Sequence, residues 1–97
     1  MPKAYVLGQV NVVDEKQYFE QYGAFVPAIV AKYGGKYIVR GGDITNVEGE
    51  LSSKRIVIME FEDKVAALNW YNSPEYKSII SGRHQNAESI INIIEGI

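Results

Sequence analysis

The stretch from Tyr33 to Asp43 constrains the fold of this chain most, because two glycine pairs bracket a short apolar run. Glycine tolerates positive φ and close approach of other groups. Gly34-Gly35 is therefore typical of a helix end, and Gly41-Gly42 of a strand that bends or bulges. Between the pairs, Tyr37 to Arg40 has the composition of a strand. The chain thus leaves a helix, enters a sheet and carries a fixed cation, Arg40, to the end of that strand.

Three further segments have the length and apolar composition of strands. They are Ala4 to Val13, Arg55 to Phe61 and Ser89 to Glu95. Gly8 interrupts the first of them, and a missing side chain within a strand often leaves room for another group. The other two segments carry apolar residues at successive positions, so both of their faces are apolar.

The first helical region begins at Asp14, which is a good N-cap, and Gln17 is placed to return the bond as a capping box. Pro27 falls inside the helical pattern and predicts a kink or a one-turn break, because its ring crowds the preceding turn. The spacing of apolar residues predicts one buried face. That face consists of Tyr18, Tyr22, Phe25, Val26, Ile29 and Tyr33.

The second helical region begins at Asp63 and is interrupted at Asn72-Ser73-Pro74-Glu75. Serine before proline is typical of a new helix N-terminus, since proline at the first helical position loses no hydrogen bond. The new segment is expected to run from Pro74 to about Gly82. The stretch from Asp43 to Ser53 is expected to connect the second and third strands, with Ile44 to Val47 as a candidate extension of the strand.

The resulting order, βαββαβ, predicts a single α+β domain over residues 1–97 with a ferredoxin-like fold: a four-stranded antiparallel sheet with both helices on one face. The opposite face would then be open. Soluble monomers avoid large exposed apolar patches, and the third and fourth strands are apolar on both faces. We therefore expect a homodimer in which a second copy covers the open face.

Composition disfavours several classes of partner. With 10 basic and 12 acidic residues the net charge is −2, which gives no reason to expect nucleic acid or an anionic membrane. No apolar run is long enough to span a membrane, and cysteine is absent, so a cytoplasmic protein is expected. One histidine and no cysteine leave no usual zinc site, and no metal or cofactor is predicted. RNA-binding domains share the βαββαβ order, but the third strand lacks their aromatic stacking platform.

Several segments together resemble the DUF1330 family over nearly the whole chain. They are Gly34 to Gly42, Glu60-Phe61, Ala66-Ala67, Trp70 to Tyr76 and Arg83. The resemblance implies a dimeric α+β barrel, in a superfamily that also holds cofactor-free monooxygenases, muconolactone-type isomerases and haem-degrading relatives. It implies no established activity. Glu62-Asp63 stands where proline-serine is commoner in the family, but Asp caps a helix as well as Ser does.

Arg40 is the first candidate site residue. An arginine on a strand beside two glycines can hold a carboxylate or an enolate through a bidentate contact. The alternative is an ion pair with Glu60 or Glu62 on the neighbouring strand.

A second group is aromatic, because an interrupted helix can gather the polar tips of Trp70, Tyr71 and Tyr76 at one opening. Tyr18 and Tyr37 are candidates for the same cavity. The alternative is a core cluster that fills the gap between helices and sheet, and this is the favoured interpretation for Trp70.

Arg83 and His84 form a third group. His84 is the only histidine and therefore the only unperturbed side chain that titrates near neutral pH. However, both residues are predicted at a helix end, where a cation suits the dipole and can bond the last carbonyls without any further function.

These residues favour a dimer that binds a small anionic or aromatic molecule between helices and sheet, and that could convert it without metal or cofactor. Arg40, Trp70, Tyr71, Tyr76, Tyr37, Tyr18 and Arg83 are the predicted binding residues. Tyr71, Glu60 and His84 are the candidates for proton transfer. The alternative function is a non-catalytic module: a regulatory ligand sensor or a structural dimerisation unit.

Overall fold

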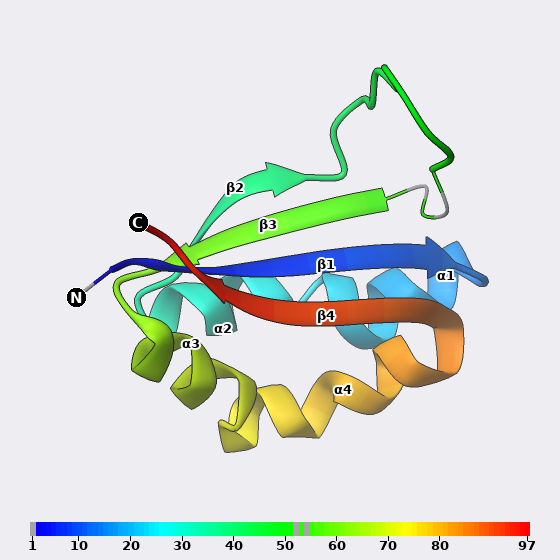
Figure 1. Cartoon of the computed structure of the whole chain (residues 1–97). Coiled ribbons are helices and arrows are strands. Elements are labelled where there is room, and N and C mark those ends of the chain that lie inside the picture. Colours follow the sequence, from blue (N-terminus) through cyan, green and yellow to red (C-terminus); the bar gives the residue numbers. More distant parts are fainter. Residues whose placement is uncertain (1, 52, 54) are drawn as a thin grey trace.

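The computed structural model describes residues 2–51, 53 and 55–97. Its four strands are β1 (Ala4–Val12), β2 (Lys36–Arg40), β3 (Arg55–Phe61) and β4 (Ala87–Glu95). They form one antiparallel sheet of order β2-β3-β1-β4, and all the helices cover the same face of it (Figure 1). The predicted ferredoxin-like arrangement is confirmed.

The first helical region is divided into α1 (Glu15–Tyr18), a π-helical turn η1 (Phe19–Gly23) and α2 (Val26–Lys32). The Asp14 side chain caps α1 by accepting a hydrogen bond from the Gln17 amide at 3.0 Å. The predicted break occurs, and Pro27 lies in the first turn of α2. The prediction of Phe25 as a buried residue is wrong, because its side chain is 51% exposed. The extra residue of the π turn shifts the helical spacing on which that prediction depended.

The second helical region consists of α3 (Lys64–Tyr71) and α4 (Pro74–Asn86). Asp63 caps α3 through a 2.8 Å bond from the Ala66 amide, and the Ser73 hydroxyl caps α4 through a 3.1 Å bond from the Tyr76 amide. The α4 helix continues past Gly82, where we expected it to end. Gly82 serves packing instead, since a Cβ there would lie 2.7 Å from the carbonyl oxygen of Gln21.

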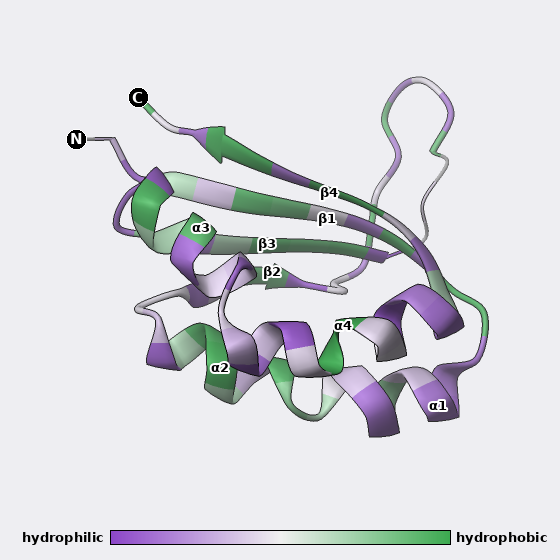
Figure 2. Cartoon of the chain, turned by 90° about the horizontal axis from the view of Figure 1, so that it is seen from below, coloured by the Kyte–Doolittle hydropathy of each residue, from purple (hydrophilic) through white to green (hydrophobic). Residues whose placement is uncertain are grey.

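The core lies between the sheet and the helices. β1, β3 and β4 carry apolar stretches, whereas α1 is mostly polar (Figure 2). The largest fully buried side chains are Trp70, Tyr76, Phe61, Val6 and Val30. Trp70 packs its ring 4.4 Å from that of Tyr76 and 5.7 Å from that of Phe61. Trp70 therefore packs as part of the core, which is the interpretation that the sequence favoured.

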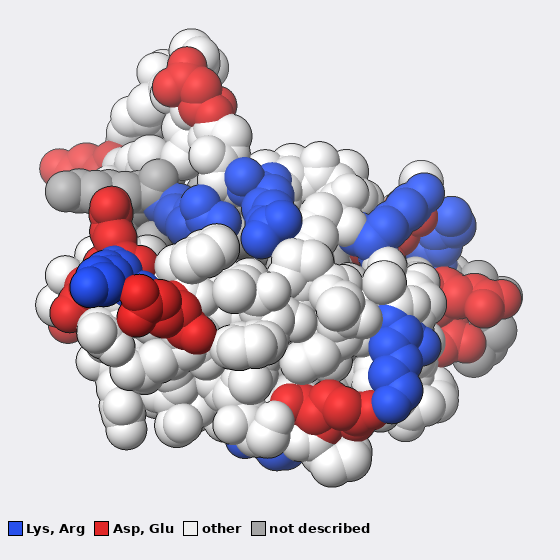
Figure 3. All heavy atoms as spheres, turned by 180° about the vertical axis from the view of Figure 1, so that it is seen from behind, with Lys and Arg blue, Asp and Glu red and all other residues white. Residues whose placement is uncertain are grey.

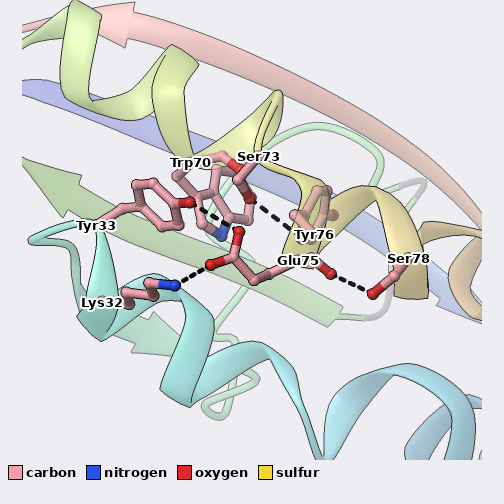
Figure 4. Close-up of polar contacts among 7 residues, drawn as sticks. All are labelled: Lys32, Tyr33, Trp70, Ser73, Glu75, Tyr76 and Ser78. Carbon is pink, nitrogen blue, oxygen red and sulfur yellow. Dashed lines mark hydrogen bonds and ion pairs between the residues drawn. The ribbon is translucent and has the colours of Figure 1, made fainter.

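A polar cluster joins α2 to the start of α4 (Figure 4). Glu75 accepts a 2.8 Å hydrogen bond from the Tyr33 hydroxyl and pairs with Lys32. These bonds lower the pKa of the Glu75 carboxyl to about 2, first through Lys32 and then through the backbone and Tyr33. The cluster connects the two helical regions at the surface.

The connection between β2 and β3 projects away from the body of the molecule (Figure 1). Its described residues contain no strand, so Ile44 to Val47 do not extend β2. Val47 is 91% exposed, so burial does not hold this segment in extended pairing. Among the described residues, no helix combines the length and apolarity that a membrane crossing requires.

The face of the sheet opposite the helices carries both apolar and charged side chains. Val6 and Val10 are buried on the helix side, so their alternate neighbours in the sheet register face the other way. Those neighbours include Ile56, Ile58, Ile90 and Ile94. Ile90 is 57% exposed and Ile94 49% exposed, so apolar side chains on this face are open to solvent in the single chain.

Candidate functional site

A β-bulge turns Arg40 toward the helices. The pairs Tyr37–Met59 and Val39–Ile58 show that β2 gains one residue relative to β3 at Ile38. Without that extra residue Arg40 would face the open side, as Lys36 does. With it, Arg40 pairs with Val57, a residue of the helix-covered face. The bulge therefore lies before the second glycine pair rather than within it.

Gly41 accommodates a second arginine beside Arg40. Its φ of 64° lies in the left-handed region, and a Cβ at this position would collide with the guanidinium of Arg55. Arg55 begins β3 opposite Val10 of β1, a residue that is only 3% exposed. Its place in the sheet register therefore directs it, like Arg40, to the covered face. In the view from behind, basic side chains lie together below the projecting loop (Figure 3).

A third arginine approaches from the helix layer. Arg83 lies in the last turns of α4 and is 3% exposed. Its guanidinium donates a hydrogen bond to the Ser89 hydroxyl and lies 3.5 Å from Nε2 of His84. It also lies over the Tyr22 ring, at 5.9 Å from the centroid. Within the described part of the chain, Arg83 therefore contacts side chains rather than the helix-end carbonyls that the alternative interpretation favoured.

These arginines surround a small cavity of about 50 Å³ between the sheet and the helices, which we call the inner cavity. It is lined by Val6, Gly8, Val10, Tyr18, Tyr22, Gly23, Val26, Tyr37, Arg40, Arg55, Val57, Met59, Trp70, Tyr76, Arg83 and Ile91. The missing side chain of Gly8 contributes to this space. A Cβ there would lie 3.4 Å from the Ile91 side chain, on the cavity side of β1.

A larger hollow of about 470 Å³ adjoins the inner cavity, and we call it the outer bowl. Its walls are Val10, Val12, Glu15, Tyr18, Phe19, Gly23, Arg40, Gly41 and Arg55. Arg40, Arg55 and Tyr18 line both spaces and therefore stand at the junction. The π turn η1 supplies part of the wall of each space, and such turns occur frequently at functional sites.

Tyrosine hydroxyls provide the other polar groups of the inner cavity. The Tyr22 and Tyr76 hydroxyl oxygens are 2.6 Å apart, and both side chains are buried. Burial raises the pKa of Tyr22, Tyr76 and Tyr18, and it raises the pKa of Tyr37 to about 12 against the opposing charge of Arg40. These phenols therefore stay protonated near neutral pH, where they can donate hydrogen bonds but are poor general bases.

Several buried nitrogens at this site lack a hydrogen-bond partner. Among the described residues they are Nε of Arg55, Nε1 of Trp70 and Nε of Arg83, and all three residues line the inner cavity. Each of these atoms is a donor with no acceptor function. A buried donor without a partner is costly, and more so when it belongs to a charged group. The cavity therefore offers unused donors to an acceptor-rich ligand.

The cavity also has an excess of positive charge. Its described lining contains Arg40, Arg55 and Arg83 but no carboxylate. Among the described residues, the predicted alternative for Arg40, an ion pair with Glu60 or Glu62, is not found. Glu60 instead lies 3.1 Å from Lys3 and 3.4 Å from Lys36. Paired with Tyr5 and Lys36 in the sheet register, it belongs to the open face.

The structure brings most of the predicted binding residues to one place. Lining the inner cavity are Arg40, Trp70, Tyr76, Tyr37, Tyr18 and Arg83. Tyr71 does not line it, but lies with His84 in a separate surface hollow next to β4. Tyr71 contacts the cluster through its ring, whose centroid lies 5.5 Å from that of Tyr76 and 6.0 Å from that of Trp70.

The candidates for proton transfer are therefore not assembled at the cavity. Glu60 lies on the opposite face of the sheet, while Tyr71 and His84 lie outside the described lining. The sequence interpretation also missed Arg55 and Tyr22 as site residues. Arg55 could have been found, because it shares its face with Val57 and Met59 when the strand alternates. Tyr22 was recognised only as part of the buried helix face.

Structures of known proteins share this fold. One is a protein of unknown function from Rhodopseudomonas palustris, with a TM-score of 0.76 and 16% identity over 99% of this chain and 83% of that one. Another is SnoaB, a cofactor-independent oxygenase from Streptomyces nogalater, with a TM-score of 0.65 and 9% identity over 100% of this chain and 95% of that one. A conserved protein of unknown function and possible oxidoreductase from Bacteroides thetaiotaomicron gives a TM-score of 0.61 and 11% identity, covering 98% of both chains.

No functionally curated protein matches the sequence. At these identities the structural similarity establishes the fold alone. The family model described as "Domain of unknown function (DUF1330)" matches residues 3–97, which is nearly the whole chain. The protein belongs to the DUF1330 family.

Proposed function

We propose that this protein binds a small organic anion in the inner cavity, between the helices and the sheet. The observation that carries the proposal is the convergence of three arginines on a space whose described lining contains no carboxylate. Arginine presents a planar fork of donors that matches a carboxylate. The partnerless Nε atoms of Arg55 and Arg83 support the same assignment, since bound carboxylate oxygens would give them acceptors.

The test compares charged ligands with neutral ligands of the same shape. A thermal-shift screen with small carboxylates, phenols and lactones should raise the melting temperature most with the carboxylates, because binding to the native state stabilises it. Benzoate and benzamide form the matched pair, since they differ mainly in charge. If benzamide stabilises the protein as strongly as benzoate, or if no carboxylate stabilises it, the proposal is wrong.

Conversion of the bound anion without metal or cofactor is a second candidate function. It is favoured by the hydrogen-bonded hydroxyls of Tyr22 and Tyr76 near the Arg83 guanidinium, because such donors can stabilise developing negative charge on oxygen. The named activity of SnoaB, a protein of the same fold, supports it by analogy only. If a ligand from the screen is converted, Tyr76→Phe should lower kcat with a smaller effect on KM. A bound ligand that is recovered unchanged would instead support a regulatory binding module.

We also propose that two copies associate through the open face of the sheet. The apolar side chains of Ile56, Ile58, Ile90 and Ile94 on that face support this proposal, since water would otherwise cover them. Sedimentation at micromolar concentration should give a dimer, and Ile90→Arg should shift it toward monomer. A purely structural dimerisation module would show this association but no response to carboxylates.

A further inference from the structure

The inner cavity is much smaller than the outer bowl, and this difference limits which part of a ligand each space can hold. An engineered cavity of about 150 Å³ binds benzene, whereas about 10–15 Å³ suffices for one water. The inner cavity, at about 50 Å³, is therefore too small for an aromatic ring but has room for a group of a few heavy atoms, such as a carboxylate. The outer bowl, at about 470 Å³, has room for a ring.

The two spaces also differ in charge. Of these two spaces, Arg83 lines the inner cavity and not the outer bowl, although it also borders the surface hollow next to β4. Glu15, the one acidic residue of the described walls of the two spaces, lines the outer bowl. An anionic group is therefore favoured more strongly in the inner cavity, where three arginines face no described carboxylate, than in the outer bowl, where Glu15 opposes Arg40 and Arg55. Arg40 and Arg55 stand between the spaces, where they can contact a headgroup that has passed the junction.

The outer bowl offers an apolar surface to the rest of the ligand. Phe19 lines the bowl and is 60% exposed, and Val10 and Val12 form the sheet side of the wall. An aromatic ring on such a surface gains both apolar burial and ring contact. Because η1 holds Phe19 directly after Tyr18, the ring surface starts at the junction itself.

We propose that the site takes a monocyclic aromatic acid in a fixed orientation, with the carboxylate in the inner cavity and the ring in the outer bowl against Phe19. This inference rests on the proposed anion binding and adds the ligand class and its direction of entry. It predicts that a smaller inner cavity weakens binding of the carboxylate, whereas loss of the Phe19 ring weakens binding of the ligand's aromatic ring.

Gly8→Ala tests the inner half. The new Cβ would lie 3.4 Å from the Ile91 side chain and 3.7 Å from Cβ of Val57, which are ordinary contact distances, so the variant is expected to fold. Alanine in place of glycine within a strand should leave the melting temperature unchanged or higher. The methyl group nevertheless reduces a space that holds only a few atoms. Calorimetric titration should show benzoate binding weakened about tenfold or more.

Phe19→Ala tests the outer half. It should weaken benzoate binding about threefold to tenfold through loss of the ring contact, and leave acetate binding, followed by NMR titration, unchanged. The matched control is Phe25→Ala, because Phe25 is similarly exposed at 51% but does not line the bowl.

The outcomes separate this inference from the proposed function. If benzoate binds but Gly8→Ala leaves its affinity unchanged, or if Phe19→Ala weakens acetate and benzoate equally, the orientation is wrong while anion binding stands. If Phe25→Ala weakens benzoate as much as Phe19→Ala does, the bowl is not the ring site. If neither acetate nor benzoate binds the unmodified protein, both proposals fail.

Discussion

The two faces of the sheet differ in whether their charged side chains are paired with groups of opposite charge. On the open face, Glu60 is shared between Lys3 and Lys36, so acidic and basic groups compensate each other at the surface. On the covered face, Arg40 and Arg55 join Arg83 around a cavity whose described lining has no acid. The same sheet therefore neutralises its charges on one side and leaves them unmatched on the other.

This difference distinguishes charges that only take part in surface ion pairs from donors that are available to a ligand. Paired surface charges contribute little to stability and specify no ligand. Unmatched buried donors reduce stability unless something accepts their hydrogen bonds, and such groups cluster at functional sites. The bulge at Ile38 decides on which side Arg40 lies, so one inserted residue moves this exposed arginine from the ion-paired face to the face that lines the cavity.

The largest effect is expected in the core beside the cavity. Trp70→Ala should lower the free energy of unfolding by about 3–5 kcal/mol, because it removes a large side chain that is 1% exposed. Denaturant unfolding measures this change. Leu68→Ala on the same helix, α3, is the control, since Leu68 is 39% exposed. Equal losses in the two variants would show that the covered face is not the tightly packed side.

The next effect separates the two faces directly. Arg55→Met should weaken benzoate binding about tenfold to a hundredfold, as expected for a lost charged hydrogen bond. Its melting temperature without ligand should be unchanged or higher, because a partnerless buried donor is removed. Lys36→Met on the open face should leave the affinity unchanged. If calorimetry shows benzoate binding equally weakened in both variants, the effect comes from the overall charge of the protein and not from the position of Arg55.

A smaller effect is expected from the hydroxyl pair. Tyr76→Phe leaves the buried Tyr22 hydroxyl without its partner and should cost about 1–3 kcal/mol of unfolding free energy. Tyr71→Phe, at a ring that contacts the same cluster from outside the cavity, should cost less. Similar unfolding curves for the two variants would contradict the role assigned to the pair.

The smallest effect concerns pH. Because the pKa of Glu75 falls from 4.5 to about 2 on folding, its stabilising contribution is present above pH 4.5 and is lost as the pH falls toward 2. The melting temperatures of the unmodified protein and Glu75→Gln should therefore differ above pH 4.5 and converge near pH 2. Glu50→Gln, in the projecting connection, is the control. A difference that stays constant with pH would mean that the Lys32 and Tyr33 contacts do not hold the carboxylate.

Local signals were sufficient to predict the element order. Asp14, Asp63 and Ser73 cap the helices that their sequence contexts indicate, and Pro27 lies at a helix break. Glycine was a less reliable signal of a helix end. Gly82 lies inside α4, where it allows close packing and does not end the helix. Capping depends on neighbours in sequence, whereas the role of a glycine depends on what packs against it.

The site was harder to predict because it depends on register between strands. The position of Arg40 depends on the bulge opposite β3, and no local pattern in β2 specifies where the extra residue falls. Arg55, by contrast, follows the simple alternation of β3 and could have been assigned to the covered face. The π turn that brings Phe19 to the bowl has no comparable local signal.

The most direct test of the central claim is a crystal structure of the protein with 4-bromobenzoate, in which anomalous scattering locates the bromine. We expect the carboxylate in the inner cavity, within hydrogen-bond distance of the Arg55 or Arg83 guanidinium, and the bromine in the outer bowl. A bromine inside the cavity with the carboxylate outside would contradict the orientation. A ligand bound only on the open face, beside Lys3 and Lys36, would contradict the claim that the unmatched arginines form the anion site.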